Sequence, residues 1–321
     1  MSTAFLAACV VGSPAAHAAA ACEWVTSDLP LPAGSNFYGV YAASDNGEWV
    51  LGDGWNTSLG SGTFFWHNGA QANGFIRDAG PSSDVNNSGV MMINGDDAAY
   101  RVANGVRERL EPHPGSSYRS WGQRINNEGD VAGLSGYMSL HGPLLVWPAG
   151  SSTPRELPNT RNGLVRFVKG IDDDGNVVAM ENGPLSQRFS HVWDRDGNQT
   201  RLETLPGDYS AEVESIRNGR IFGRSVPQDW QQPSTVVEWG LDGKIVRTLP
   251  GLYNVEDSNA SGHVLAQVPS SGSQAEYAVW RGPGELDTPP GLTGQRLADN
   301  GDVTGTLYDE NSSTPRYARC G

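Results

Sequence analysis

The chain has 321 residues and combines 41 glycines and 20 prolines with only 18% charged residues, a composition typical of short strands joined by tight turns. Its 36 acidic and 22 basic residues give a net charge of −14, which argues against a nucleic-acid or anionic-membrane partner, since phosphate-binding surfaces are basic. No segment keeps the apolar spacing of an amphipathic helix beyond about two turns. We therefore predict an all-β protein.

The first 21 residues differ from the rest of the chain. Thr3–Gly12 is apolar and is followed by small residues in an Ala-x-Ala arrangement, which predicts a secretory signal peptide over residues 1–21 and a secreted mature chain over residues 22–321. The run Leu6–Cys9 also fits a lipoprotein box, in which case Cys9 would carry a lipid anchor. No other segment approaches the roughly 18 apolar residues of a membrane span.

A short polar turn that ends in glycine recurs seven times, at intervals of 39 to 46 residues, and each copy precedes an apolar strand. Glycine supplies the positive φ that a hairpin turn needs, and the Asn or Asp beside it tolerates that conformation. Each copy therefore predicts a hairpin. The seven glycines are Gly47, Gly89, Gly129, Gly175, Gly219, Gly262 and Gly301.

Two further markers follow the turns in chain order. An alternating strand ends in an aromatic residue in six of the units, at Trp66, Tyr100, Trp147, Trp193, Trp239 and Trp280. A Leu-Pro pair then closes the unit at Leu157-Pro158, Leu205-Pro206 and Leu249-Pro250. Four strands in about 43 residues is the size of a propeller blade, so we predict a seven-bladed β-propeller over residues 22–321.

The two ends of the chain complement each other. The seventh unit stops at Cys320 without a fourth strand, whereas Cys22–Pro32 is a lone strand placed before the first unit. We expect this N-terminal strand to complete the last blade and a Cys22–Cys320 disulfide to replace the missing hairpin. Loop-closure entropy allows such a bond roughly 5 kcal/mol of stabilisation.

Two stretches of the third unit, Arg124–Gly133 and Leu144–Trp147, resemble the extracellular HAF-type repeat of bacteria, which pairs an Ile-Asn-x-x-Gly-x-Val-x-Gly hairpin with an Ala-Phe-x-Trp strand. The resemblance extends loosely from Leu29 to Cys320 and implies a propeller fold in an exported setting, without a defined activity. More remotely, the chain is similar to secreted seven-bladed propeller lectins, including those of umbrella toxin particles.

In a propeller, the loops that join strand D to strand A and strand B to strand C share one face. Aromatic residues on such polar loops can stack on the apolar face of a sugar, or alternatively pack between blades. We expect Trp55 and Trp230 to be the strongest ligand-binding candidates, because both lie among polar residues. The other candidates are Tyr137, His141, Tyr308, Tyr118, Arg119, Tyr209 and Tyr253, with Phe37 and Tyr38 on the same loops. The repeated Trp147, Trp193, Trp239 and Trp280 are expected in the core.

Neither a metal site nor a cofactor is expected. The aspartates of Asp172–Gly175 and Asp194–Gly197 occupy turn positions and lack the remaining ligands of a calcium loop. Motifs for a serine hydrolase, a zinc protease or a phosphate-binding loop are missing. The carboxylate pairs Asp96–Asp97 and Glu212 with Glu214 leave a polysaccharide lyase or hydrolase as a lesser alternative.

The favoured hypothesis is a secreted, non-catalytic, lectin-like protein that recognises an extracellular or cell-surface glycan. The alternative is a protein-interaction scaffold, or a subunit of an exported assembly such as an antibacterial toxin. A monomer is expected unless the chain belongs to such an assembly.

Overall fold

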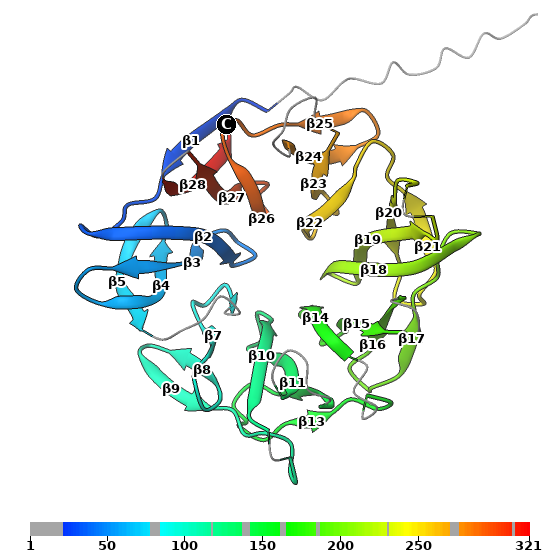
Figure 1. Cartoon of the computed structure of the whole chain (residues 1–321), viewed down its shortest axis with the longest axis horizontal. Helices are drawn as coiled ribbons and strands as arrows, with labels where there is room; N and C mark the ends of the chain where they lie inside the picture. The colour runs from blue at the N-terminus through cyan, green and yellow to red at the C-terminus, as the bar shows by residue number, and fades with distance from the viewer. Residues whose placement is uncertain are drawn as a thin grey trace, which may run out of the picture.

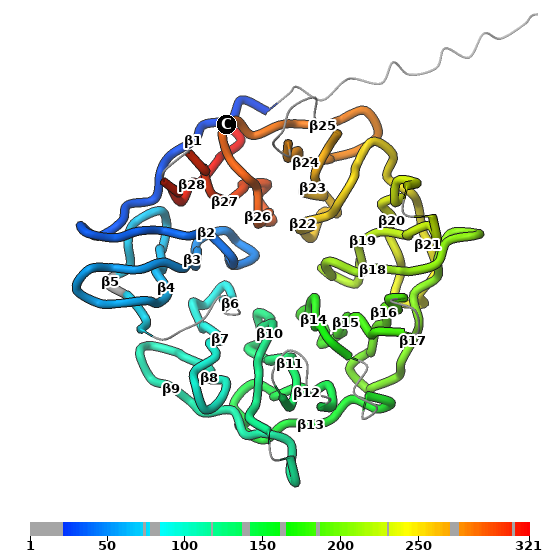
Figure 2. The backbone as a smooth tube through the Cα atoms, viewed as in Figure 1, coloured from blue at the N-terminus to red at the C-terminus, as the bar shows by residue number. Residues whose placement is uncertain are grey.

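The computed structural model describes residues 22–77, 84–116, 118–136, 142–160, 165–183, 187–229, 231–269, 276–309 and 312–321. The expected signal peptide and Cys9 lie outside these residues. Seven sheets of four antiparallel strands surround a central axis (Figure 1), which confirms the predicted all-β, seven-bladed propeller. In each blade, strand A lies next to the axis and strand D at the rim (Figure 2).

The strands of the first four blades follow chain order. Blade 1 contains β2 (Ser35–Ala43), β3 (Trp49–Asn56), β4 (Gly60–His67) and β5 (Ala70–Arg77), and blade 2 contains β6 (Asp84–Val85), β7 (Met91–Asn94), β8 (Ala99–Ala103) and β9 (Val106–Arg109). Blade 3 contains β10 (Ser120–Ile125), β11 (Val131–Ser135), β12 (Leu144–Trp147) and β13 (Arg155–Glu156). Blade 4 contains β14 (Val165–Ile171), β15 (Val177–Asn182), β16 (Arg188–Trp193) and β17 (Gln199–Arg201).

The last three blades include the closure of the ring. Blade 5 contains β18 (Asp208–Arg217), β19 (Arg220–Pro227), β20 (Thr235–Trp239) and β21 (Ile245–Thr248), and blade 6 contains β22 (Asn254–Ser258), β23 (Val264–Val268), β24 (Glu276–Gly282) and β25 (Glu285–Asp287). Blade 7 combines β26 (Thr293–Leu297), β27 (Val303–Tyr308) and β28 (Ser313–Cys320) with β1 (Trp24–Asp28) from the other end of the chain.

The ring closes as the sequence predicts. β1 pairs antiparallel with β28, in a register that places Trp24 opposite Cys320 and Asp28 opposite Arg316. A disulfide joins Cys22 to Cys320, with 5.4 Å between their Cα atoms. The chain ends are therefore held by strand pairing and by a covalent bond (Figure 1).

The repeated tryptophans form the core between blades. Trp66, Trp147, Trp193 and Trp239 have no exposed surface, and Trp280 is 6% exposed, so the predicted core positions are confirmed. Four of these indoles also donate Nε1–H to a linker carbonyl that follows strand D of the preceding blade, for example Trp147 to Glu111 at 2.8 Å and Trp193 to Pro158 at 3.1 Å. Each tryptophan thus fills the core and ties two blades together.

The closing leucine differs from the sequence prediction in two units. The fully buried residue is Leu29 in the N-terminal segment and Leu202 in blade 4, whereas the predicted Leu31 and Leu205 are only partly buried against the same clusters. Leu29 donates its amide N–H to Pro315, and Leu202 does so to Ser190, each across to strand C. Pairing with strand C, rather than the Leu-Pro motif, therefore sets where strand D ends.

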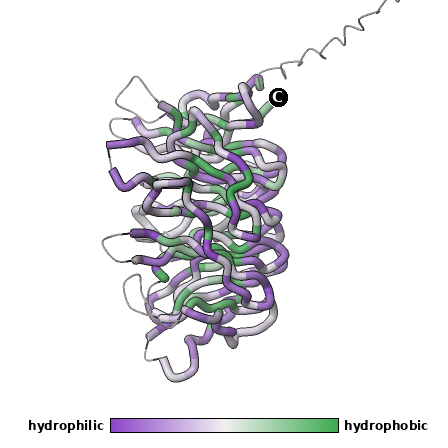
Figure 3. The backbone as a smooth tube through the Cα atoms, turned by 90° about the vertical axis from the view of Figure 1, so that its right-hand side faces the viewer, coloured by the Kyte–Doolittle hydropathy of each residue, from purple (hydrophilic) through white to green (hydrophobic). Residues whose placement is uncertain are grey.

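The two faces of the ring carry different connections. All seven predicted turn glycines have positive φ, from 71° to 93°, and join strand A to strand B on what we call the turn face. The connections from D to A and from B to C lie on the opposite side, the loop face. Seen from the side, hydrophobic positions run through the middle of the disc (Figure 3).

Candidate functional site

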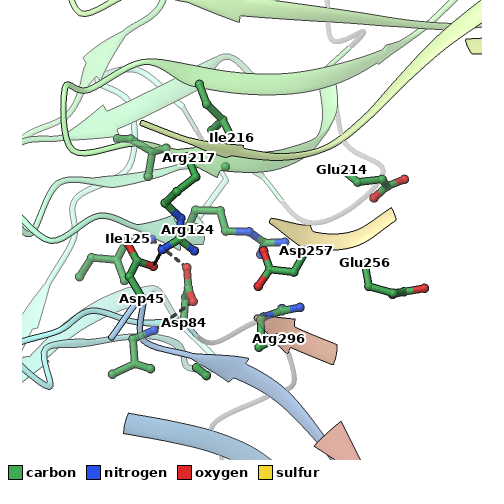
Figure 4. A pocket seen from close by; sticks show the side chains of 14 residues that line it. Asp45, Asp84, Arg124, Ile125, Glu214, Ile216, Arg217, Glu256, Asp257 and Arg296 are labelled. Atoms are coloured by element: carbon green, nitrogen blue, oxygen red, sulfur yellow. Dashed lines mark hydrogen bonds and ion pairs between the residues drawn. The ribbon is translucent and has the colours of Figure 1, made fainter. Parts of the chain in front are cut away.

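A pocket lies on the axis of the ring and is lined mainly by the strands A of all seven blades. Its charged residues are Asp45, Asp84, Arg124, Glu214, Arg217, Glu256, Asp257 and Arg296 (Figure 4). Five carboxylates thus face three guanidinium groups inside the channel. Most of these charged side chains form hydrogen bonds or ion pairs with residues of other blades.

Two aspartates at equivalent positions link neighbouring blades. Asp84 in blade 2 accepts the amide N–H of Ile125 in blade 3 at 3.1 Å. Asp257 in blade 6 accepts the amide N–H of Leu297 in blade 7 at 2.9 Å. Burial raises the pKa of Asp84 above its ordinary value, although the charges of Arg124 and Arg296 oppose this shift.

Two arginines continue the same pattern. Arg124 in blade 3 donates Nε–H to the carbonyl of Lys169 in blade 4 at 3.0 Å. Arg296 in blade 7 donates to the carbonyl of Tyr41 in blade 1. Because these arginines also lie beside the buried aspartates, they serve as structural counter-ions between blades.

A third arginine crosses the channel at the turn face. Arg217 ends strand A of blade 5 and forms an ion pair with Asp45 of blade 1 (Figure 4). Asp299 of blade 7 lies 3.8 Å from the same nitrogen. Asn127 of blade 3 donates to Asp45 at 2.8 Å and to Asp173 of blade 4 at 3.0 Å. Side chains from five blades therefore meet across this end of the channel.

The charges of this cluster depend on burial. Burial raises the pKa of Asp45 to about 6, against the opposing charge of Arg217. Burial acts to lower the pKa of Arg217, but the carboxylates of Asp45, Asp257 and Asp299 more than offset it, so the pKa is raised. Arg217 is therefore a permanent cation at the turn-face end of the channel.

The turns around this end form a ladder of hydrogen bonds. The amide N–H of Asn46 donates to Asn87 at 2.8 Å, that of Asn87 to Asn127 at 2.9 Å, and that of Asn127 to Asp173 at 2.8 Å. The ladder resumes from Ala260 to Asp299. Each of these Asn and Asp side chains thus caps the preceding turn along the ring, which explains their recurrence without a ligand.

The aspartate-rich turn of blade 4 belongs to the same system. Asp172 accepts the amide N–H of Asn176 at 2.8 Å and that of Gly219 at 3.1 Å. Among the described residues, no three His, Cys, Asp or Glu side chains are grouped so that they could hold a metal ion. The turn interpretation of Asp172–Gly175 therefore has a direct structural basis.

The loop face carries the exposed aromatic residues. Among the described residues, six aromatic side chains are 40–52% exposed, namely Tyr38, Trp55, Tyr118, Phe167, Tyr253 and Tyr308. Each lies at the start of a strand A, just before one, or at the end of a strand B. The exposed large residues of the rim and of the turn face are aliphatic, namely Val25, Val106, Leu241, Val246 and Leu286.

The structure places the predicted ligand-binding residues in three groups. Trp55, Tyr118, Tyr253 and Tyr308 are exposed on the loop face, and Trp55 lies within β3 and not in a loop. Tyr209 and Arg119 are half-buried, and Arg119 donates to the carbonyl of Gly95 at 3.1 Å and packs 5.2 Å from the ring centre of Trp121. Tyr137, His141 and Trp230 lie outside the described residues.

The carboxylate pairs considered for glycosidase chemistry are bound to separate partners. Glu212 accepts hydrogen bonds from Arg224 at 2.8 and 2.6 Å and lies 3.2 Å from Arg188. Glu214 pairs instead with Lys169. Asp97 accepts a hydrogen bond from Tyr100 at 2.7 Å.

Apart from Glu214, neither the charged residues of the channel nor Phe167 were predicted as functional residues from the sequence. A signal was present, because Arg124 and Arg296 both stand directly before the last apolar residue of a strand A. Strand bulges beside them alter which side chains face the axis. Alternation alone could therefore not assign them to the channel.

Comparison with known proteins shows the fold alone. The β-propeller domain of the Trilobed protease from Pyrococcus furiosus, which has an open velcro topology, is similar with a TM-score of 0.60, 12% identity, and coverage of 89% of this chain and 96% of that chain. YCF48 from Cyanidioschyzon merolae is similar with a TM-score of 0.54, 12% identity and coverage of 91% and 98%. Hydrazine synthase of Kuenenia stuttgartiensis has a TM-score of 0.56, 14% identity and coverage of 86% and 94%.

No family model and no curated protein matches the chain. The comparisons therefore support the seven-bladed propeller but neither the HAF-type repeat nor the propeller lectins as relatives. Within the described residues, no helix is long and apolar enough to cross a membrane.

Proposed function

We propose that the protein is a secreted binding protein that recognises an extracellular or cell-surface glycan through its loop face. The observation that carries this proposal is the segregation of all six exposed aromatic side chains of the described residues onto that face. Aromatic rings held at the ends of rigid strands can stack on sugar rings at little entropic cost.

The arrangement of the turn face also favours binding from the loop face. The turn-face end of the channel is crossed by Arg217 and its carboxylate partners, and the surrounding turns are joined by hydrogen bonds. A ligand that enters the channel would therefore approach from the loop face. The Cys22–Cys320 disulfide agrees with an oxidising, extracellular setting.

The test is a glycan-array screen of residues 22–321 with the disulfide intact, followed by titration of the best ligand. Trp55→Ala and Tyr308→Ala should each weaken binding several-fold without lowering the melting temperature. Leu241→Ala is the matched control, since Leu241 is 41% exposed but lies on the turn face. Equal binding by all three variants, or no glycan bound, would refute the proposal.

A protein-interaction scaffold is the second candidate. It is favoured by the exposed aliphatic residues Val25, Val106, Val246 and Leu286, all on outermost strands at the rim. Such a surface can contact a partner chain. Pull-down from the native culture supernatant distinguishes this function from glycan binding, because a scaffold should capture a partner protein that Val106→Ser and Val246→Ser no longer capture. Release of reducing sugar ends in the glycan assay would instead indicate an enzyme.

A further inference from the structure

One sector of the loop face joins aromatic and polar side chains into a continuous network. In blade 6, the amide N–H of Tyr253 donates to the carbonyl of Gln267 at 2.8 Å. The Gln267 side chain donates to Glu256 at 2.9 Å and lies 3.2 Å from the hydroxyl of Tyr277. Asn254 also donates to Glu256, at 3.3 Å.

The network continues across blade 7 into blade 1. Tyr277 of blade 6 packs against a core cluster that includes Leu292 and Val303, and Tyr308 ends the strand that Val303 begins. The Tyr308 hydroxyl then reaches blade 1, where it lies 3.1 Å from the position that a Cβ would take on Gly39. Tyr38, the residue before Gly39, is half exposed.

These contacts define an aromatic arc, by which we mean Tyr253, Tyr277, Tyr308, Tyr38 and Trp55, on the loop face of blades 6, 7 and 1. Four of its five rings are 40–52% exposed. Gly39 is what lets blades 7 and 1 approach here, since a side chain at that position would press against the Tyr308 hydroxyl. The arc therefore spans the loop face of three neighbouring blades.

The polar groups beside the arc are hydrogen-bond acceptors. The Asn254 side-chain oxygen is buried and has no hydrogen-bond partner among the described residues. Among the described residues, the Glu256 carboxylate receives hydrogen bonds only from the side-chain amides of Asn254 and Gln267. Glu214 lines the same part of the channel (Figure 4). A ligand that satisfies these groups must donate hydrogen bonds, as sugar hydroxyl and acetamide groups do.

The charge of this sector also restricts the ligand. A uronate or sulfate group would place its own acceptor oxygens against Glu256, whose hydrogen-bond donors are the neutral amides of Asn254 and Gln267, in a protein whose net charge is −14. Like charges within a partly buried site repel strongly. An uncharged sugar has no such conflict.

We infer that the aromatic arc of blades 6, 7 and 1 is the binding subsite for an uncharged polysaccharide chain, with Glu256 and Asn254 accepting hydrogen bonds from its sugars. This inference rests on the proposed glycan-binding function and assigns that function to one sector and one ligand class. The other side of the ring offers a comparison, because Tyr118 of blade 3 is 44% exposed outside the arc.

The experiment measures depletion of the disulfide-intact protein by insoluble chitin and cellulose, and its retardation in gels that contain pectate. The wild type should bind chitin or cellulose but not pectate. Tyr308→Ala and Tyr253→Ala should each weaken binding by about twofold to tenfold, the range expected for one stacked ring, whereas Tyr118→Ala should leave it within about twofold. Tyr308→Phe should retain most of the binding because it keeps the ring.

A second variant tests the acceptor group. Glu256→Gln keeps the shape of the side chain but removes its charge, so it should weaken binding of the uncharged chain and lessen the exclusion of pectate. Thermal melting establishes that each variant is folded. Binding that is lost in Tyr118→Ala but kept in the arc variants, or a preference for pectate, would overturn the inference while leaving the proposed function in place. Failure to bind chitin, cellulose, pectate and every array glycan would overturn both.

Discussion

Removing the disulfide that closes the ring should cost a large part of the stability. Cys22 and Cys320 are 298 residues apart, so the cross-link restricts nearly the whole unfolded chain. Loop-closure entropy allows a stabilisation of up to about 5 kcal/mol for such a long loop. With an unfolding entropy of about 2.1 cal/mol/K per residue, the loss of about 5 kcal/mol corresponds to a fall in melting temperature of about 8 °C.

The variant to use is Cys22→Ser/Cys320→Ser, which leaves neither cysteine of the pair unmatched. β1 still pairs with β28 through Trp24–Asp28, and Leu29 is 3% exposed, so the native ring should persist at low temperature. Calorimetry should show the lower melting point, and amide exchange in β1 should become faster than in the other outer strands. Reduction of the wild type should reproduce both effects.

The double variant also provides the control, since reductant should leave its melting temperature unchanged. A melting temperature within about 2 °C of the wild type would refute this reasoning, because strand pairing alone would then close the ring. A further fall when the double variant is reduced would place the redox effect elsewhere in the chain.

Three further predictions concern buried groups. Arg217→Met should lower the free energy of unfolding by about 3 kcal/mol in chemical denaturation, since it leaves the Asp45 carboxylate without its partner, and adding Asp45→Asn should recover part of the loss. Burial lowers the pKa of His191 to about 4, so the unfolded chain binds more protons than the folded chain between pH 4 and 6.5, and the free energy of unfolding falls as the pH decreases. Between pH 7 and 4.5, the free energy of unfolding of His191→Gln should therefore fall by about 2 kcal/mol less than that of the wild type, measured from denaturant midpoints at both pH values. An equal fall in both proteins would contradict this prediction. Trp239→Phe should cost about 2 kcal/mol in the same assay, because it leaves a gap and removes the donor to the Glu203 carbonyl; an unchanged midpoint would show that this bond is dispensable.

The sequence by itself determined the architecture, because its signals are local. Each turn glycine from Gly47 to Gly301 needs positive φ wherever the hairpin lies, and all seven have it. The tryptophan that ends strand C is equally fixed within the unit, as at Trp147 and Trp193. Counting these units predicted seven blades, and the incomplete seventh unit predicted the role of Cys22 and β1.

The positions of strand ends were less predictable. Leu29-Pro30 and Leu31-Pro32 are consecutive Leu-Pro pairs, yet only Leu29 is fully buried, and Leu202, which no proline follows, is buried more deeply than Leu205. The Leu-Pro pair alone therefore does not identify the buried leucine. The choice depends on which amide N–H aligns with strand C, and such alignment is a property of strand pairing.

The functional surface was decided by the tertiary structure. Phe37 and Tyr38 are adjacent in the sequence, but Phe37 is 2% exposed and Tyr38 is 50% exposed. Successive side chains of a strand point to opposite sides, and only the Phe37 ring packs against Phe64 and Trp66. Arg217 and Asp45 come from blades 5 and 1, and no local pattern relates them. Closing the ring brings such residues together across the axis, so the blocked turn face and the aromatic loop face exist only in the folded propeller.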